Sequence, residues 1–287
     1  MPDTEIGSIA LDQDITLRRM IVRAAAPKGT VLLLHGFPET LLAFQDIAHA
    51  LAEDYDVHAF DWPGYGGSSR PSPETFSYVP SAYARVLRDY IDQAGIDRST
   101  LTIYATDISG LPALLLALEE PDIARSLIVG DFAPLDRPAL MYPNLQGLKA
   151  EPSATPIRAA MKAGRDEILA NTFHRGLPPE THFPLAPELR DDLALGWGED
   201  ETTVVDAFAH YYAHFTRDQE HFEANHAQLT TPLRLLWGSE DFYIDKAMGA
   251  ELADRLQAPL RLLSGVGHYA HLQAPQRVID EIRAAAC

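Results

Sequence analysis

Short apolar segments alternate with helical patterns along most of the chain, and this alternation limits the possible folds more than any other feature. Six segments have the continuous apolar character of strands that are buried on both faces. They are 29–36, 54–64, 99–107, 124–134, 231–241 and 258–268. Segment 14–22 adds a strand-like alternation, and helical spacing occupies 40–54, 79–95 and 110–120. The pattern predicts an α/β fold with a doubly wound, mostly parallel sheet.

Residues 135–229 interrupt this alternation. They contain several proline clusters and the helical stretches 156–173 and 202–215, but no convincing strand. A structureless loop of this length is improbable inside a domain. We therefore expect a helical cap at 135–229, inserted into a core that is formed by 1–134 and 230–287.

The charge balance and the single cysteine limit the partners and the compartment. The chain has 23 basic and 41 acidic residues, with a formal charge of −18, so its surface should repel nucleic acid and anionic membranes. Its only cysteine is Cys287, which excludes a disulfide framework within one chain. The N-terminal residues lack the pattern of a signal peptide, and no segment reaches the roughly 18 apolar residues of a membrane span. We expect a cytoplasmic protein with a small-molecule partner, either monomeric or homodimeric.

The turn after segment 99–107 carries an aspartate where a nucleophile could stand. A nucleophile between a strand and a helix needs small residues two positions before and after it, because the backbone turns sharply there. Asp107 has Ala105 and Ser109 at these positions, whereas Ser109 would have Asp107 and the large Leu111. An isolated aspartate in such a place is more often a helix N-cap. The catalytic interpretation of Asp107 therefore depends on partners elsewhere in the chain.

Such partners follow two later apolar segments. Asp241 comes directly after the strand-like part of 231–241, and His268 ends 258–268. Carboxyl ends of parallel strands are where open α/β sheets place their sites, so Asp107, Asp241 and His268 should meet there. The segment "LLLHGFPET" would bring backbone N–H groups to the same edge. The 11 histidines show no metal-ligand spacing, so we expect no metal and no cofactor.

These motifs together resemble the α/β-hydrolase family, and the resemblance covers nearly the whole chain. "HGFPE", "DWPGYGGSS", the turn at Asp107, "WGSED" and "GVGH" occur in the order of that family. With aspartate as the nucleophile, the chain is most similar to epoxide hydrolases and to haloalkane or haloacetate dehalogenases. Members of this branch carry a helical cap.

The resemblance implies a two-step mechanism. Asp107, ionised at neutral pH, would attack a saturated carbon and form an alkyl ester. His268, oriented by Asp241, would then activate water against this ester. The backbone N–H groups of Phe37 and Ile108 would stabilise the oxyanion.

Departures from the family patterns favour an epoxide as the substrate, giving a vicinal diol. Haloalkane dehalogenases usually have a tryptophan after the nucleophile, where this chain has Ile108, and fluoroacetate dehalogenases have arginines there that "DISGLP" lacks. Epoxide hydrolases use cap tyrosines to donate a proton to the ring oxygen. We expect Tyr212 in this role, since it shares the apolar stripe of 202–215. Alternatives for the cap donors are Tyr211, Tyr142, His174 and His182.

Several alternatives stay open at this stage. Asp131, at the end of the preceding strand, could replace Asp241 as the acid, because some relatives take the acid from that position. A dehalogenase would use the same ester mechanism, and an esterase could use Ser109. The fold also occurs in ligand-binding and non-hydrolytic biosynthetic proteins.

Overall fold

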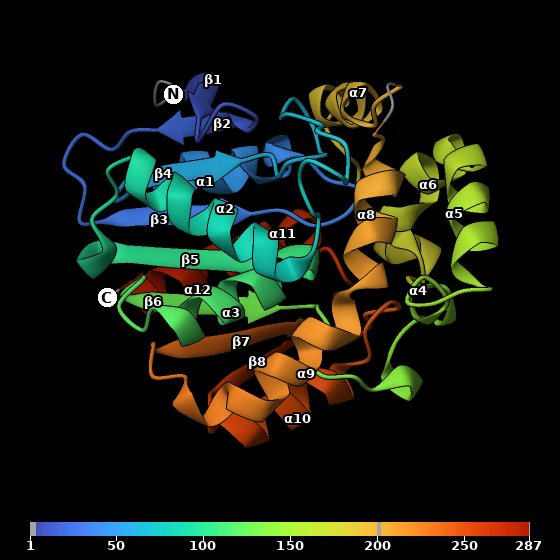
Figure 1. The fold of residues 1–287 in the computed structure, drawn as a ribbon. Coiled ribbons are helices and arrows are strands. Elements are labelled where there is room, and N and C mark those ends of the chain that lie inside the picture. Colours follow the sequence, from blue (N-terminus) through green and yellow to red (C-terminus); the bar gives the residue numbers. More distant parts are fainter. Residues whose placement is uncertain (1–3, 200–201, 287) are drawn as a thin grey trace.

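The computed structural model describes residues 4–199 and 202–286, which contain an eight-stranded sheet (Figure 1). The strands are β1 (Thr4–Ala10), β2 (Thr16–Val22), β3 (Thr30–Leu34), β4 (Asp56–Phe60), β5 (Leu101–Thr106), β6 (Ser126–Gly130), β7 (Leu233–Gly238) and β8 (Leu260–Leu263). They are arranged in the order β1-β2-β4-β3-β5-β6-β7-β8. β2 pairs antiparallel with both β1 and β4, and the other pairs are parallel. This confirms the predicted mostly parallel sheet. Cys287 lies outside the described residues.

Helices cover both faces of the sheet, as the continuous apolar strands require. In β3, Leu32 and Leu34 face one helical layer, and Val31 and Leu33 face the other. The first layer contains α2 (Pro80–Gln93), α3 (Gly110–Glu119) and α10 (Lys246–Leu256), and the second contains α1 (Gln45–Leu51) and α12 (Pro275–Ala286). The doubly wound arrangement predicted from the sequence is thus present.

Two details differ from the sequence prediction. β1 was not expected; it is an edge strand whose side chains are mostly exposed, so it lacks the apolar run that identified the other strands. The helical pattern of 156–173 is divided into α5 (Ala154–Ala163) and α6 (Arg165–Asn171), with Gly164 between them. Glycine at this point disfavours a continuous helix.

Between β6 and β7, the described chain consists of helices, turns and an isolated β-bridge from Met141 to Ile244. The longer helices are α4 (Pro143–Gly147), α5, α6, α7 (Pro187–Gly196), α8 (Val204–Ala213) and α9 (Phe215–Asn225). Figure 1 shows α4 to α8 gathered at one end of the sheet, whereas α9 packs against α2 and α3. The inserted segment therefore forms a helical cap and then returns to the core through α9.

Asp206 in α8 fixes the position of two cap helices. It forms a capping box with Thr203 at the start of α8, and its carboxylate also binds Arg158 and Lys162 of α5, the latter at 2.8 Å. Burial would raise the pKa of Asp206, but these cations and the Thr203 backbone lower it to about 2.

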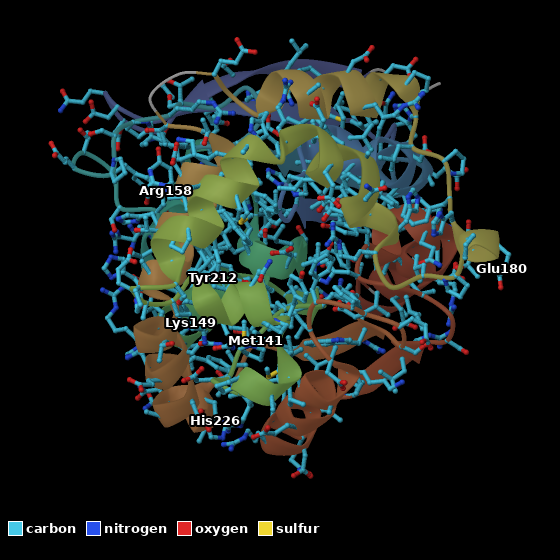
Figure 2. All side chains as sticks on the ribbon, turned by 90° about the vertical axis from the view of Figure 1, so that its right-hand side faces the viewer. Met141, Lys149, Arg158, Glu180, Tyr212 and His226 are labelled. Atoms are coloured by element: carbon cyan, nitrogen blue, oxygen red, sulfur yellow. The ribbon has the colours of Figure 1, made fainter. Side chains whose placement is uncertain are left out.

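Figure 2 looks onto the cap and shows Tyr212, also from α8, near the centre of this face below Arg158.

Candidate active site

Asp107 stands at the sharp turn between β5 and α3. Its φ is +52°, in the left-handed region that residues with a Cβ rarely adopt. Neighbouring glycines make room for the turn. A Cβ on Gly36 would lie 2.5 Å from the Cβ of Asp107, and one on Gly110 would lie 2.5 Å from the ring of Phe132. A strained backbone of this kind often occurs at functional sites.

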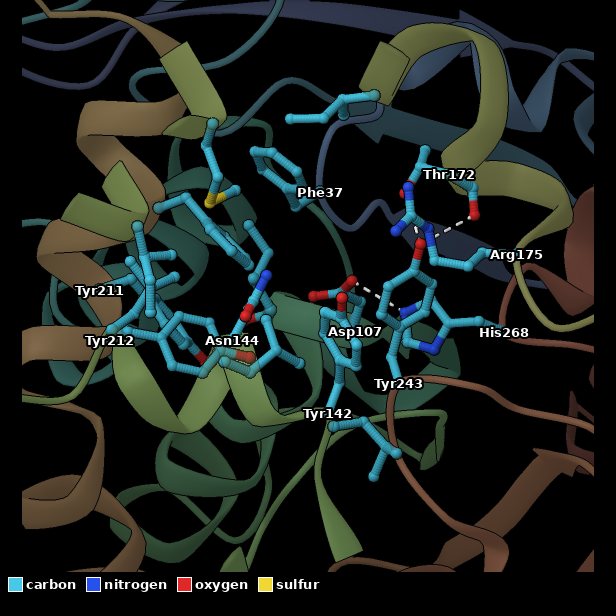
Figure 3. Close-up of a pocket in the computed structure, with 18 of the residues that line it drawn as sticks. Phe37, Asp107, Tyr142, Asn144, Thr172, Arg175, Tyr211, Tyr212, Tyr243 and His268 are labelled. Atoms are coloured by element: carbon cyan, nitrogen blue, oxygen red, sulfur yellow. Dashed lines mark hydrogen bonds and ion pairs between the residues drawn. The ribbon is translucent and has the colours of Figure 1, made fainter. Parts of the chain in front are cut away.

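His268 connects Asp107 with Asp241, and Figure 3 shows its contact with Asp107. Its Nε2 lies 2.9 Å from Oδ2 of Asp107, and its Nδ1 lies 2.9 Å from Oδ2 of Asp241. Oδ1 of Asp241 accepts backbone hydrogen bonds from Tyr243 at 2.8 Å and from Ile244 at 3.1 Å, which fix the carboxylate. The structure thus brings together the three residues that follow β5, β7 and β8.

The two carboxylates favour a protonated imidazole at His268. Burial alone would lower the pKa of His268, because it penalises the charged ring. The negative charges and hydrogen bonds of Asp241 and Asp107 outweigh burial and raise this pKa well above its usual value of 6.5. The contacts of His268 thus favour the imidazolium form of its ring in the resting site.

Asp131 lies at the end of β6, between the strands that carry Asp107 and Asp241. Its φ is +51°, and its Oδ1 accepts a hydrogen bond from the N–H of Gly238 at 2.8 Å. Burial and the nearby charge of Asp241 raise the pKa of Asp131 well above its usual value. Burial therefore favours the protonated form of Asp131, whereas Asp241 is the acid that binds the imidazole of His268.

The loop that carries Phe37 is attached to the segment that follows His268. Oε2 of Glu39 accepts the N–H of Gly36 at 2.9 Å, and Oε1 lies 2.6 Å from Nε2 of His271. The hydroxyl of Tyr269 donates to the Phe37 carbonyl at 2.8 Å. These bonds hold the loop of the expected oxyanion site in a fixed position relative to the catalytic histidine candidate.

Ser109 has a structural environment. Its side chain is fully buried and donates to the carbonyl of His35, while it accepts the indole N–H of Trp62 at 2.8 Å. It does not line the cavity described below. The ring of His35 is also buried, which lowers its pKa, and its Nε2 accepts the Trp62 backbone N–H at 3.2 Å. Neither side chain is positioned as a nucleophile or base.

A cavity of about 450 Å³ lies between Asp107 and the cap. Phe37 and Ile108 line it beside the nucleophile. Most of its wall is apolar and includes Leu145, Leu148, Ile157, Met161, Phe208 and Phe215. The volume suits a small organic molecule that is largely buried when bound.

Adjacent tyrosines of α8 reach this cavity but differ in their hydrogen bonds. The hydroxyl of Tyr211 donates to the carbonyl of Ile108 at 3.0 Å. The buried Tyr212 also lines the cavity, and within the described part of the chain its hydroxyl forms no hydrogen bond to a protein group. Burial, followed by the charges of Asp107 and Asp241, raises the pKa of Tyr212 well above 10. Tyr212 therefore remains a proton donor that is available to a bound molecule.

The structure places one of the other expected cap donors at the cavity and two away from it. Tyr142 lines the cavity. His174 and His182 do not: their rings stack at 4.5 Å, and each bonds to a backbone carbonyl, so this expectation is corrected.

Sequence reasoning missed several polar residues of the wall, among them Asn144, Glu167, Arg175 and Tyr243. The first three of these belong to the cap, where no periodic pattern indicates which side chains face inward. Tyr243 follows Asp241 closely, and this proximity was the one available signal.

Two further features concern other classes of function. Within residues 4–199 and 202–286, no three His, Cys, Asp or Glu side chains are grouped so that they could hold a metal ion. None of the described helices combines the length and apolar character needed to cross a bilayer.

Comparisons with known proteins identify related sequences and folds. A family described as "Alpha/beta hydrolase family" matches residues 31–281. Fluoroacetate dehalogenase from Burkholderia sp is 36% identical over 42% of this chain and 39% of its own length. Mouse epoxide hydrolase 4 is 25% identical over 77% of this chain and 62% of its own length. The solved structure of a haloalkane dehalogenase DbeA loop variant from Bradyrhizobium elkanii has a TM-score of 0.78 and 21% identity, and the match covers 99% of both chains. The chain thus matches only about two fifths of the dehalogenase and about three fifths of the epoxide hydrolase.

Proposed function

The chain belongs to the alpha/beta hydrolase family, and we propose that it hydrolyses a small organic epoxide to a vicinal diol through an alkyl ester on Asp107. One observation carries the epoxide assignment. The hydroxyl of Tyr212 and the carboxylate of Asp107 border the same cavity, and this hydroxyl has no partner among the described protein groups. An epoxide needs both a nucleophile and a proton donor for its ring oxygen.

The first step joins the substrate to Asp107. Oδ2 of Asp107 is occupied by His268, which leaves Oδ1 to attack a ring carbon. As this C–O bond of the ring breaks, Tyr212 donates its proton to the ring oxygen, because water is largely excluded below the cap. The products are a hydroxyalkyl ester and a Tyr212 phenolate. His268 and Tyr212 lie on opposite sides of Asp107, so the proton that the imidazolium loses reaches the phenolate through the water that enters for the second step.

The second step hydrolyses the ester. Esterification removes the charge of Asp107, so the pKa of His268 falls and the neutral ring becomes a base. His268 takes a proton from water, which attacks Cγ of Asp107, and the N–H groups of Phe37 and Ile108 stabilise the oxyanion. The bond between Cγ and the alkyl oxygen breaks, and the new carboxyl proton passes to that oxygen. Diol, carboxylate and imidazolium are the final species.

A dehalogenase is the second candidate, since the same ester would form with halide as the leaving group. The amide of Asn144 borders the cavity and could bind a halide together with Tyr212. The similarity to fluoroacetate dehalogenase supports this candidate. The absence of a tryptophan at position 108 argues against it, because the ring N–H there is a halide donor in the haloalkane dehalogenases that this chain resembles.

Turnover of matched substrates distinguishes the two candidates. Wild-type protein is incubated with terminal epoxides and with haloalkanes of the same carbon skeleton, and diol formation and halide release are measured. We expect diol formation with kcat/KM well above that for halide release. Halide release without diol formation would replace the epoxide assignment with the dehalogenase. If neither product forms across the panel, the hydrolytic assignment fails.

A further inference from the structure

Arg175 brings a permanent positive charge to the cavity wall. It follows the short helix Thr172–His174 of the cap, and it lines the same cavity as Asp107. The other charged residues of this wall are Asp107, Asp131, Glu167 and His268. Arg175 is thus the one lysine or arginine among the described residues that form the wall.

The present partner of Arg175 is easily replaced. Its Nη2 donates to Oε1 of Glu167 at 2.5 Å, but the two side chains are 30% and 55% exposed. Ion pairs with such exposure contribute little to stability, because water screens them. A guanidinium has five N–H donors, and Glu167 occupies one side of it. A side-chain hydrogen bond with Tyr142, which also lines the cavity, holds the guanidinium at the cavity wall, and the guanidinium has donors beyond these two contacts.

The position of Arg175 relative to Asp107 suggests how a substrate would lie. In Figure 3, Arg175 and Tyr243 lie on the His268 side of Asp107, whereas Tyr212 and Asn144 lie on the opposite side. An epoxide above Asp107 with its oxygen toward Tyr212 would direct a substituent toward Arg175. The rings of Tyr243 and His268 meet edge to face, with their centroids 5.0 Å apart, on the Arg175 side of Asp107.

Charge limits what this substituent can be. An anionic substrate approaching Asp107 would meet a carboxylate, in a protein of net charge −18. A cation beside the nucleophile offsets this repulsion, and an apolar substituent would gain nothing from a guanidinium. Arginine also binds carboxylates through two parallel hydrogen bonds, which fixes their orientation.

We propose that Arg175 binds a carboxylate of the substrate, so that the preferred substrate is an epoxide bearing a carboxylic acid. The carboxylate takes the place of Glu167 on the guanidinium, while the ring lies above Asp107. The epoxide part of this statement rests on the proposed function, whereas the carboxylate part rests on Arg175 alone.

The test compares each epoxy acid with its primary amide, over a series of increasing chain length. The measured quantity is the ratio of kcat/KM for the acid to kcat/KM for the amide. We expect this ratio to exceed one in the wild type and to fall about 10- to 100-fold in Arg175→Gln, the size expected for a charge-assisted hydrogen bond. Arg175→Lys should fall between the two. Glu167→Gln should raise the ratio, because it removes the competing carboxylate.

A matched control removes the same charge elsewhere in the cap. Arg190 is exposed on α7 and does not line the cavity, so Arg190→Gln should leave the ratio unchanged. Circular dichroism and urea unfolding check that each variant is folded. A ratio near one in the wild type, or an equal fall in Arg175→Gln and Arg190→Gln, would overturn the proposal.

Binding of unreactive ligands separates this inference from the epoxide assignment. Short alkanoates and their amides are titrated into the wild type and Arg175→Gln, and binding is followed by calorimetry. We expect the alkanoate to bind more tightly than the amide, and this preference to be lost in Arg175→Gln. That result together with no epoxide turnover would retain the carboxylate site and reject the epoxide. Equal binding of alkanoate and amide to the wild type would reject the carboxylate site.

Discussion

Nε2 of His268 lies 2.9 Å from Oδ2 of Asp107, the carboxylate that we propose as the nucleophile. The same group would therefore attack the substrate and help to hold the proton on the imidazole. Once Asp107 is an ester, Asp241 is the remaining carboxylate bound to the ring, at 2.9 Å. The relationship links the protonation of His268 to the chemical state of Asp107 and leads to the first prediction.

Removing the charge of Asp107 should lower the pKa of His268. In the wild type, the ring should stay protonated as the pH rises through 6.5, because its pKa is raised well above this value. In Asp107→Asn, it should lose its proton at a lower pH than in the wild type. The measurement is the pH titration of the His268 ring signals by NMR. Asp46→Asn, on the exposed side of α1, is the control that should not move this titration. An unchanged or higher pKa in Asp107→Asn would contradict the proposed coupling.

The two tyrosines of α8 should affect different steps. Tyr212→Phe removes the proton donor for the ring oxygen, so it should slow alkylation of Asp107 by an epoxide about 10²-fold. It should leave hydrolysis of a preformed ester nearly unchanged. Tyr211→Phe instead removes the hydrogen bond to Ile108, which shares the nucleophile turn, and should slow both steps. Rapid quenching followed by intact-mass analysis measures each step. Alkylation at the wild-type rate in Tyr212→Phe would remove its assignment as the donor.

Asp241 and Asp131 should differ strongly when each is changed to asparagine. Asp241→Asn removes the charge that orients and stabilises the imidazolium, so ester hydrolysis should fall by about 10³- to 10⁴-fold. Asp131 is buried and its pKa is raised, so asparagine resembles the protonated form that burial favours. Asp131→Asn should therefore cost less than about 10-fold, since the side-chain oxygen can still accept from Gly238. A larger loss for Asp131→Asn in single-turnover kinetics would transfer the role of acid to Asp131.

The buried pair of Glu39 and His271 should be important for stability. Burial would raise the pKa of Glu39, but His271 and the Gly36 N–H lower it below 4.5. This stabilisation is present above pH 4.5 and is lost as the pH falls through the lower folded value. His271→Leu would leave Glu39 buried without its partner and should cost about 3 to 5 kcal/mol in urea unfolding at neutral pH. Adding Glu39→Gln should recover part of this loss. If His271→Leu costs less unfolding free energy than the double variant His271→Leu/Glu39→Gln, Glu39 and His271 do not stabilise the fold as a buried pair.

The core of the fold and the candidate triad could be predicted because they depend on a local signal. Asp107, Asp241 and His268 each follow a buried strand, and parallel strands bring their carboxyl ends to one edge. The small neighbours of Asp107 indicate the sharp turn from the sequence alone. The sequence analysis favoured Asp241 and kept Asp131 as the alternative, but a position after a strand does not separate the two, because both follow strands. The choice depends on which carboxylate reaches Nδ1 of His268, and that is a matter of tertiary packing.

The cap could be predicted as a helical insertion but not in its inward-facing residues. Arg175 lies in a short turn, and Asn144 lies in a helix of a single turn, so neither belongs to a periodic pattern. The role of Tyr211 also depended on distance, since only the structure places its hydroxyl on Ile108. β1 was missed because an exposed edge strand has no apolar face to detect.

The most direct test of the account is the mass of the His268→Gln variant after exposure to an epoxide. Asp107 attacks without help from a base, whereas hydrolysis needs His268, so this variant should react once and stop as the ester. We expect an increase in intact mass equal to the whole epoxide, located on Asp107 by peptide sequencing and missing in Asp107→Asn/His268→Gln. If His268→Gln forms no adduct with any epoxide or haloalkane that the wild type converts, Asp107 is not the nucleophile and the proposed mechanism is wrong.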